Sequence, residues 1–266
     1  MSESRNRAES ALRKHVEPEL SDPTLLLAFE GWNDAGDAAS LAASYVADEL
    51  GLSPLAEIDP DEFFDFTVQR PQVEFDETGT RQVAWPTVDF RFGALREGRD
   101  VVVGIGPEPH LRWREFCGLV RGYARDLGVR RVVLLGAYLA DVVYSRPVEV
   151  TGFASKPEWL AELSVSPSRY EGPTGIVGVL GQLFQEDGLD VVSLWAGLPH
   201  YINATPNPRG ALALLQMLST CLELKLDETP LREQAAEYER RTNELVTSDP
   251  ELTEYVRELK RREFAQ

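Results

Sequence analysis

The first residues in this sequence that could do chemistry lie in a polar turn at residues 30–37, Glu-Gly-Trp-Asn-Asp-Ala-Gly-Asp. Asn33 or Asp34 can cap a helix that starts here, because a short side-chain oxygen accepts hydrogen bonds from the free N–H groups of a first turn. Asp34 and Asp37 also suit the positive end of a helix dipole, and two carboxylates there repel a phosphate. A site for an amine, a hydroxyl or a cation stays open, but we expect both aspartates to serve as caps.

The segments on either side of this turn must hold it in place. The apolar run 25–29 predicts a buried strand, and the alanine-rich segment after the turn predicts a helix that stops at Gly51. Strand, turn and helix together form the opening βα unit of an α/β domain. The spacing of Gly31 and Gly36 resembles a phosphate loop, but aspartate and alanine follow where lysine and a hydroxyl should stand.

Polar side chains also follow the later predicted strands, at the edge where a parallel sheet binds its ligands. Carboxylates that share such a site repel one another, so one of them can have a raised pKa and act as an acid or a base. The candidate pocket consists of Trp32, Asn33, Asp34, Asp37, His110, Asp141, Arg146, Thr174 and Asn203.

Several of these residues have a simpler structural role as an alternative. Arg146 could clamp an anion bidentately, but we favour an ion pair with Asp141. Thr174 precedes a helix whose free N–H groups could bind an anion, although a plain helix cap is the commoner arrangement. Trp32 could stack on a ligand, but we expect it to cover the core.

Composition and missing motifs disfavour several classes of protein. The net charge of −17 and the lack of a basic stripe argue against binding DNA or RNA. No apolar run is long enough to span a membrane and residues 1–20 do not resemble a secretory signal, so we expect a cytoplasmic protein without a membrane partner. The sequence has no G-x-S-x-G elbow and no HExxH motif, and we expect Cys117 and Cys221 to be buried free thiols. We therefore expect no metal and no cofactor, and favour a non-enzymatic protein over an enzyme.

The alternation of strands and helices predicts a three-layer αβα core over residues 23–228, with a mostly parallel sheet between the helices. Residues 1–22 are expected to form a flexible tail with a helical stretch around 5–14. A β-rich excursion of hairpins is expected at 61–93, and an edge strand at 148–153. The expected core strands are 25–29, 55–59, 101–105, 131–135 and 191–196, the excursion strands are 64–68, 81–85 and 88–92, and the later helices are 112–127, 157–163, 175–187 and 209–226.

Residues 229–266 predict a C-terminal helical hairpin. Thr229 is expected to cap its first helix, and Ser248 with Glu251 makes a capping box for its second. The apolar stripes of both helices are thin, so the hairpin needs a neighbour, which is either its own domain or a second subunit. We expect a homo-oligomer and predict that deleting residues 229–266 releases monomers.

Four stretches of the sequence form a recognisable set. They are AFEGWNDAGDAAS at residues 28–40, the segment 135–147, the segment 170–178 (Tyr-Glu-Gly-Pro-Thr-Gly-Ile-Val-Gly) and Pro-Asn-Pro at 206–208. Their order and spacing, over roughly residues 24–262, resemble the proteasome-assembly-chaperone family in its bacterial and archaeal branch, of the actinobacterial type.

The resemblance implies an αβα core similar to nucleoside phosphorylases, with additions, and a trimer or another small ring. Some members of the family hold proteasome α-subunits during ring assembly, and some dock into the ring through a C-terminal hydrophobic-Tyr-any tail. This sequence ends Phe264-Ala265-Gln266, with alanine in place of the tyrosine. The resemblance therefore implies proteasome subunits as partners, but not docking by the tail.

Two functions of different classes follow. The first is a non-enzymatic assembly or scaffold factor similar to proteasome-assembly chaperones. The second is a small-molecule-binding protein or enzyme that uses the polar pocket at the carboxyl ends of the strands. A deep, closed pocket with converging polar groups would favour the second function.

Overall fold

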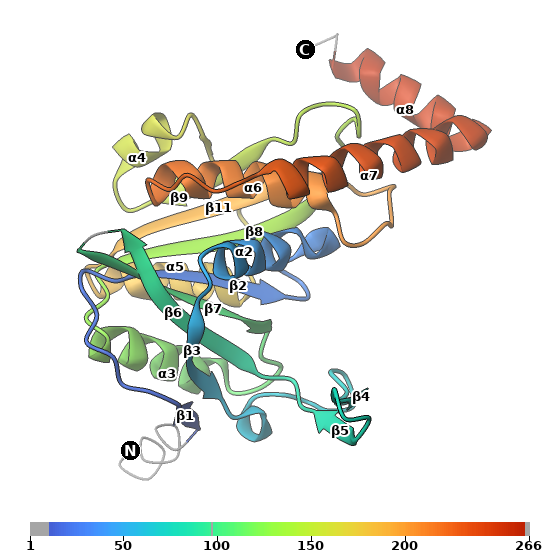
Figure 1. Cartoon of the computed structure of the whole chain (residues 1–266). Helices are drawn as coiled ribbons and strands as arrows, with labels where there is room; N and C mark the ends of the chain where they lie inside the picture. The colour runs from blue at the N-terminus through green and yellow to red at the C-terminus, as the bar shows by residue number, and fades with distance from the viewer. Residues whose placement is uncertain (1–10, 97, 264–266) are drawn as a thin grey trace.

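The centre of the fold is a run of parallel strands that lie side by side in the order β7 (Arg99–Pro107), β2 (Thr24–Glu30), β8 (Arg131–Ala140) and β11 (Asp190–Pro199) (Figure 1). They are seen in a computed structural model that describes residues 11–96 and 98–263. Parallel strands are covered on both faces, so their sequences are continuous apolar runs. This explains why each of these strands was visible in the sequence.

Further strands widen the sheet on both sides. β6 (Val88–Arg96) pairs antiparallel with β7, and β3 (Ser53–Ile58) and β1 (Leu12–Lys14) follow it outward. On the other side, β9 (Val150–Ala154) pairs antiparallel with β11, and β10 (Ser166–Pro167) pairs parallel with β9. In the part of the chain that is described the sheet has nine strands. The predicted α/β fold, with a parallel core to its large mixed sheet, is confirmed.

Helices cover both faces of this sheet. α2 (Ala38–Glu49), α4 (Pro157–Glu162) and α6 (Pro208–Cys221) pack on one face, and α3 (Trp113–Asp126) and α5 (Ile176–Glu186) pack on the other. α6 lies between α2 and α7 (Thr229–Ser248), and its Leu214, Leu215 and Leu218 are buried as its apolar sequence predicts. Among the residues described, no helix is both long enough and apolar enough to cross a membrane.

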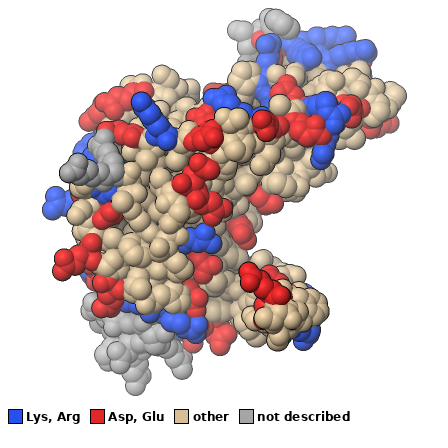
Figure 2. Space-filling view, viewed as in Figure 1, with Lys and Arg blue, Asp and Glu red and all other residues tan. Residues whose placement is uncertain are grey.

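The β-rich excursion differs in part from expectation. Residues 64–65 have no regular structure and residues 66–68 form a turn, so the strand predicted at 64–68 is wrong. Phe63 and Phe64 follow a short 3-10 turn, η2 (Pro60–Glu62), and fill the core beside α3. β4 (Gln72–Phe75) and β5 (Arg81–Ala84) form a separate two-stranded hairpin that projects from the body (Figures 1 and 2). The last predicted strand of the excursion joins the main sheet as β6.

The margins of the sheet also differ from the sequence-based expectation. Residues 12–14, placed in a flexible helical tail, form β1 and pair with β3. Residues 1–10 lie outside the described part of the chain. The strand near 148–153 is not the edge of the sheet, because β10 pairs on its outer side.

α7 and α8 (Pro250–Glu263) form the predicted C-terminal helical hairpin. The Asp249 carboxylate caps α8 by accepting hydrogen bonds from the N–H groups of Glu251 at 2.8 Å and Leu252 at 3.2 Å. The predicted capping box is therefore wrong, and the Ser248 hydroxyl donates instead to the Leu245 carbonyl. In the same way the Asp227 carboxylate, not Thr229, bonds the first N–H of α7.

The hairpin packs on its own domain. Val246, Val256 and Leu259 are buried against Tyr144 and Ile202, which belong to the loops after β8 and β11. The apolar residues of the hairpin were expected to be covered either by its own domain or by a second subunit. These three are covered by the hairpin's own domain.

The burial of α6 makes a direct prediction about stability. Leu214 is fully buried and Leu212, on the same helix, is half-buried. Leu214→Ala should lower the free energy of unfolding by about 2–5 kcal/mol, because it removes packing and leaves a cavity. Denaturant titration of both alanine variants checks this, and an equal loss for Leu212→Ala would contradict the packing described.

Candidate functional site

The turn after β2 is built around the side chain of Asp34. Its carboxylate accepts hydrogen bonds from the N–H groups of Ala39 at 2.6 Å and Ser40 at 3.1 Å. These are free N–H groups in the first turn of α2, reached across a short 3-10 turn, η1 (Ala35–Asp37). The predicted cap by Asp34 is confirmed, whereas Asp37 is exposed and its side chain makes no cap bond.

Asn33 joins three elements at the ends of the strands. Its backbone carbonyl accepts a hydrogen bond from the N–H of Ala137 in β8, and its side-chain amide donates to the Glu108 carboxylate, both at 2.8 Å. The same Glu108 oxygen accepts a hydrogen bond of 2.7 Å from the N–H of Ile176, the first residue of α5. Glu108 therefore supplies the anion at the helix N-terminus that follows Thr174.

The space between Asn33 and α5 is closed. A Cβ added to Gly175 would lie 2.0 Å from the Asn33 Oδ1 atom, so only glycine fits beside it. Oδ1 is buried and has no hydrogen-bond partner among the residues described. The turn that contains Asn33 therefore packs closely against Gly175 at the start of α5.

Negative charge accumulates at the end of β2. Burial raises the pKa of the Glu30 carboxyl, and the nearby charges of Asp34 and Asp37 add to the rise. Burial also raises the pKa of the Asp34 carboxyl, against the hydrogen bonds from Ser40 and Ala39 that favour its ionised form. The carboxyls of Glu30 and Asp34 are therefore weaker acids than an exposed carboxyl.

Asp141 contacts the C-terminal hairpin. Its carboxylate lies 3.0 Å from Nε2 of His200 and accepts a hydrogen bond of 3.3 Å from the Tyr255 hydroxyl. His200 Nε2 is also 2.9 Å from that hydroxyl, and the Tyr201 ring packs edge-on against both rings. This cluster attaches the loops after β8 and β11 to α8.

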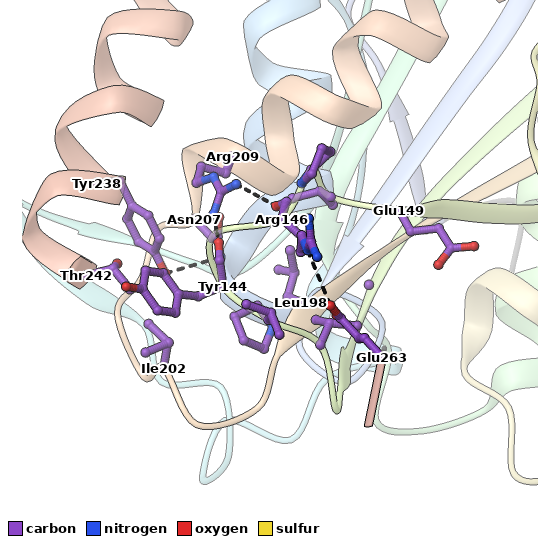
Figure 3. Close-up of a pocket in the computed structure, with 16 residues that line it drawn as sticks. Tyr144, Arg146, Glu149, Leu198, Ile202, Asn207, Arg209, Tyr238, Thr242 and Glu263 are labelled. Carbon is purple, nitrogen blue, oxygen red and sulfur yellow. Dashed lines mark hydrogen bonds and ion pairs between the residues drawn. The ribbon is translucent and has the colours of Figure 1, made fainter. Parts of the chain in front are cut away.

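A cavity of about 110 Å³ lies between the hairpin and these loops (Figure 3). Arg146, in its wall, lies 3.3 Å from the Glu263 carboxylate, so the favoured pair with Asp141 is wrong. The Arg209 guanidinium donates hydrogen bonds to the backbone carbonyls of Tyr144 and of Arg146. Ligand pockets commonly measure about 300–1,000 Å³, so this cavity fits a group of only a few atoms.

The remaining predicted residues lie elsewhere. Trp32 is 58% exposed, so the expectation that it covers the core is wrong. Asn203 and Thr174 are exposed as well. His110 Nδ1 accepts a hydrogen bond of 3.2 Å from the N–H of Asp65. The structure therefore brings Asn33 to the start of α5 and Asp34 to the start of α2, and it holds Asp141 and Arg146 against the C-terminal hairpin. It does not gather the predicted residues in one pocket.

The cysteines are free thiols, with Cys117 buried and Cys221 half-buried. Burial raises the pKa of Cys117 to about 11 and of Cys221 to about 12, so both thiols stay protonated at neutral pH. Within residues 11–96 and 98–263, no group of three or more His, Cys, Asp or Glu side chains is placed to hold a metal ion.

Sequence reasoning left two structural residues out of the candidate site. Glu108 was visible only as a carboxylate after a predicted strand, and nothing local showed that it reaches α5. Asn207 accepts a hydrogen bond of 3.1 Å from the N–H of Gly210 at the start of α6, and its own N–H donates to the Gly36 carbonyl at 2.7 Å. Its position before Pro208, at the start of a predicted helix, was an available signal for a cap.

Removing the Glu108 carboxylate should destabilise the strand ends. Glu108→Ala leaves the buried amide of Asn33 and the N–H of Ile176 without an acceptor, so the free energy of unfolding should fall by about 2–4 kcal/mol. Glu171→Ala changes an exposed glutamate five positions before Ile176, is the matched control and should change the free energy of unfolding by less than about 0.5 kcal/mol. Denaturant unfolding measures both, and a neutral Glu108→Ala would show that the carboxylate is not the acceptor.

The raised pKa of Glu30 predicts how stability depends on pH. A raised pKa in the folded protein means that stability is greatest below the ordinary pKa of the carboxyl and is lost as pH rises through the raised value. Glu30→Gln removes this loss, so the variant should melt at a higher temperature than the parent at pH 8, with the gap shrinking as pH falls to 4. Thermal unfolding across this range tests it, and a gap that stays constant with pH would contradict it.

The chain is similar to one protein family and to several proteins of known structure. The model of the PAC2 family matches residues 28–246. A PAC2 family protein from Streptomyces avermitilis is 41% identical, with a TM-score of 0.80, over 88% of this chain and 100% of that chain. A proteasome-assembly chaperone homologue from Mycobacterium tuberculosis is 39% identical, with a TM-score of 0.78, over 88% of this chain and 99% of that chain. A comparison with curated proteins gave no match.

More distant structures share the fold. An archaeal proteasome activator from Pyrococcus furiosus is 19% identical, with a TM-score of 0.71, over 88% of this chain and 97% of that chain. The family model begins within β2 and ends within α7, so it includes the turn of Asn33 and Asp34, and the resemblance drawn from four sequence stretches is confirmed. The chain belongs to the PAC2 family.

Proposed function

We propose that this protein is a non-enzymatic assembly or scaffold factor whose partners are proteasome subunits. Its likeness to a proteasome-assembly chaperone homologue extends over 88% of the chain at 39% identity, which supports a related role. The strand-end residues Asn33 and Glu108 are bonded to one another, which suits a structural role better than a reactive one.

The observation that carries the proposal is the shape of one side of the molecule. Figure 2 shows the α7–α8 hairpin and the β4–β5 hairpin projecting on the same side of the body, with a wide concave surface between them that carries acidic side chains. A concave surface between two projecting arms fits a folded partner rather than a small molecule. Its charge favours a partner with a basic surface.

The root of the β4–β5 hairpin offers a specific contact. A hollow of about 340 Å³ there is lined by three acidic residues, Glu30, Asp48 and Asp89, and by Trp85. Arg91 lines it too and lies 3.2 Å from the Asp48 carboxylate, so Glu30 and Asp89 carry most of the uncompensated negative charge. Trp85 is 53% exposed and packs edge-on against Phe66. Lysine and arginine bind both carboxylates and aromatic faces, so this hollow fits basic side chains of a protein partner. Residues 264–266, where the sequence departs from the hydrophobic-Tyr-any tail, lie outside the described part.

Substitutions in this hollow test the proposal. Asp48→Lys and Trp85→Ala should weaken binding to proteasome α-subunits of the same host at least about tenfold. Thermal unfolding of each variant separates this loss from the small change in stability expected because Asp48 pairs with Arg91 and Trp85 packs against Phe66. Glu162→Lys on α4 makes the same change of charge elsewhere and should bind as the parent does. Native mass spectrometry of mixtures, followed over time, measures both binding and ring assembly. A parent protein that neither binds α-subunits nor alters the rate of ring assembly would refute the proposal.

One observation favours a second function, a small-molecule-binding protein or enzyme at the strand ends. Carboxyls with raised pKa values, as at Glu30 and Asp34, are frequent in functional sites. A ligand present at about 100 times its Kd should add roughly 2.7 kcal/mol of stability. A thermal-shift screen of amines and other cations, with Asp34→Asn as the comparison, should find such a ligand if this function is real.

The expected homo-oligomer, such as a trimer, stays a prediction. The hairpin was its expected interface, but the buried side chains of α7 and α8 are covered by their own chain. If the protein forms a homo-oligomer, we therefore expect the contact between its copies to use another element.

A further inference from the structure

The β4–β5 hairpin has one apolar face, and that face is exposed. Val73 in β4 lies opposite Val83 in β5, and Phe75 lies opposite Arg81. Side chains of directly paired residues, and of residues two positions apart on one strand, lie on the same face of a sheet. Val73, Phe75 and Val83 are large apolar side chains on one face, and all three are exposed. The opposite face is polar apart from one alanine and consists of Gln72, Glu74, Gln82 and Ala84.

The hairpin is held in shape by its own turn rather than by packing on the body. β4 is exposed along its whole length, and β5 is exposed except at Ala84. The Asp76 carboxylate accepts hydrogen bonds of 2.9 Å from the N–H groups of Thr78 and Thr80. It also accepts one of 2.8 Å from the side-chain amide of Gln82. An element that is already ordered loses less entropy on binding, so the turn prepares the apolar face for a partner.

The apolar face leads into the acidic hollow at the root of the hairpin. Trp85 follows Val83 by two positions, and it lines the hollow together with Glu30 and Asp89. Burial and the nearby charge of Glu57 raise the pKa of the Asp89 carboxyl, and burial also raises that of Glu30. A positive charge in the hollow would stabilise the ionised form of both carboxyls. The surface is therefore apolar along the hairpin and acidic at its root.

We propose that the apolar face of the hairpin and the hollow at its root bind one segment of a proteasome α-subunit, in which apolar side chains are followed by a lysine or an arginine. The apolar side chains cover Val73, Phe75 and Val83. The basic side chain enters the hollow beside Trp85, where carboxylates and an aromatic ring can bind it. Arg81, opposite Phe75, disfavours the reverse orientation. This binding mode rests on the proposed function and specifies the chemistry that the chain recognises in its partner.

A basic segment of a partner fits this surface better than a second copy of this chain does. The hairpin face is four residues long, or roughly 13 Å. Two such faces packed on each other bury much less than the about 800 Å² that each partner contributes to a stable interface. The net charge of −17 means that a second copy would also bring more negative charge to the hollow. A short segment needs only a face of this size, and its basic residue complements the carboxylates.

Substitutions at the two ends of the surface give different signatures. Phe75→Ser removes an apolar contact, so it should weaken binding to α-subunits of the same host at least about tenfold and leave the salt dependence of the affinity unchanged. Asp89→Asn removes a charge, so it should weaken binding and also make the affinity less dependent on salt. Glu74→Ser, on the polar face of the same hairpin, is the matched control and should bind as the parent does. Calorimetric titration at low and high salt measures the affinities, and thermal unfolding checks each fold.

A photo-crosslinker at the hairpin identifies the segment directly. The chain with p-benzoylphenylalanine in place of Phe75 is irradiated with α-subunits, and mass spectrometry locates the crosslinked peptide. We expect a peptide of the α-subunit in which apolar residues are followed by a lysine or an arginine.

The outcomes separate this binding mode from the proposed function. If the parent binds α-subunits and Phe75→Ser binds equally well, or if the crosslinked peptide lacks a basic residue, this binding mode is wrong and the proposed function stands. Crosslinks between copies of this chain would assign the hairpin face to a second copy and would also contradict it. If the parent does not bind α-subunits, both are overturned.

Discussion

The hydrogen bonds of Asn33 and Asp34 determine how the carboxyl ends of the central strands are joined. Asp34 fixes the start of α2, and Asn33 ties the end of β2 to β8 through its backbone and to Glu108 through its side chain. Glu108 in turn fixes the start of α5. A buried polar group without a partner is costly, so each member of this network constrains the next. The edge at which α/β proteins commonly bind ligands is therefore largely occupied here by the protein's own polar groups.

We therefore expect the function of this protein to depend on its outer surface. The α7–α8 hairpin is held on the loops after β8 and β11 by an aromatic cluster and by the contacts of Asp141 and Arg146. The β4–β5 hairpin projects from the opposite end of the same side (Figures 1 and 2). Both projections present charged or apolar side chains to solvent, including Phe75, which is 70% exposed. A scaffold that engages folded partners accounts for such projections more directly than a pocket enzyme does.

The sequence predicted the features that depend on neighbours in the chain. The central strands were recognisable because burial on both faces makes them continuously apolar, and Asp34 was recognisable as a cap because its partners Ala39 and Ser40 follow closely. Contacts between distant segments were not predictable in this way. Glu108 bonds Asn33 and Ile176 across 75 and 68 positions, and no local pattern records either contact. The prediction of a strand at 64–68 is wrong because aromatic residues indicate burial, and a residue in a turn can be buried as well as one in a strand.

We propose that this PAC2 family protein acts on other proteins rather than on a small molecule. Native mass spectrometry of the protein isolated untreated from its own host distinguishes the two, because the measured mass includes every molecule that stays bound to the chain. We expect particles that contain proteasome subunits together with this protein. A particle made only of this protein, carrying a tightly held small molecule, would contradict it, and the excess mass would begin to identify the ligand.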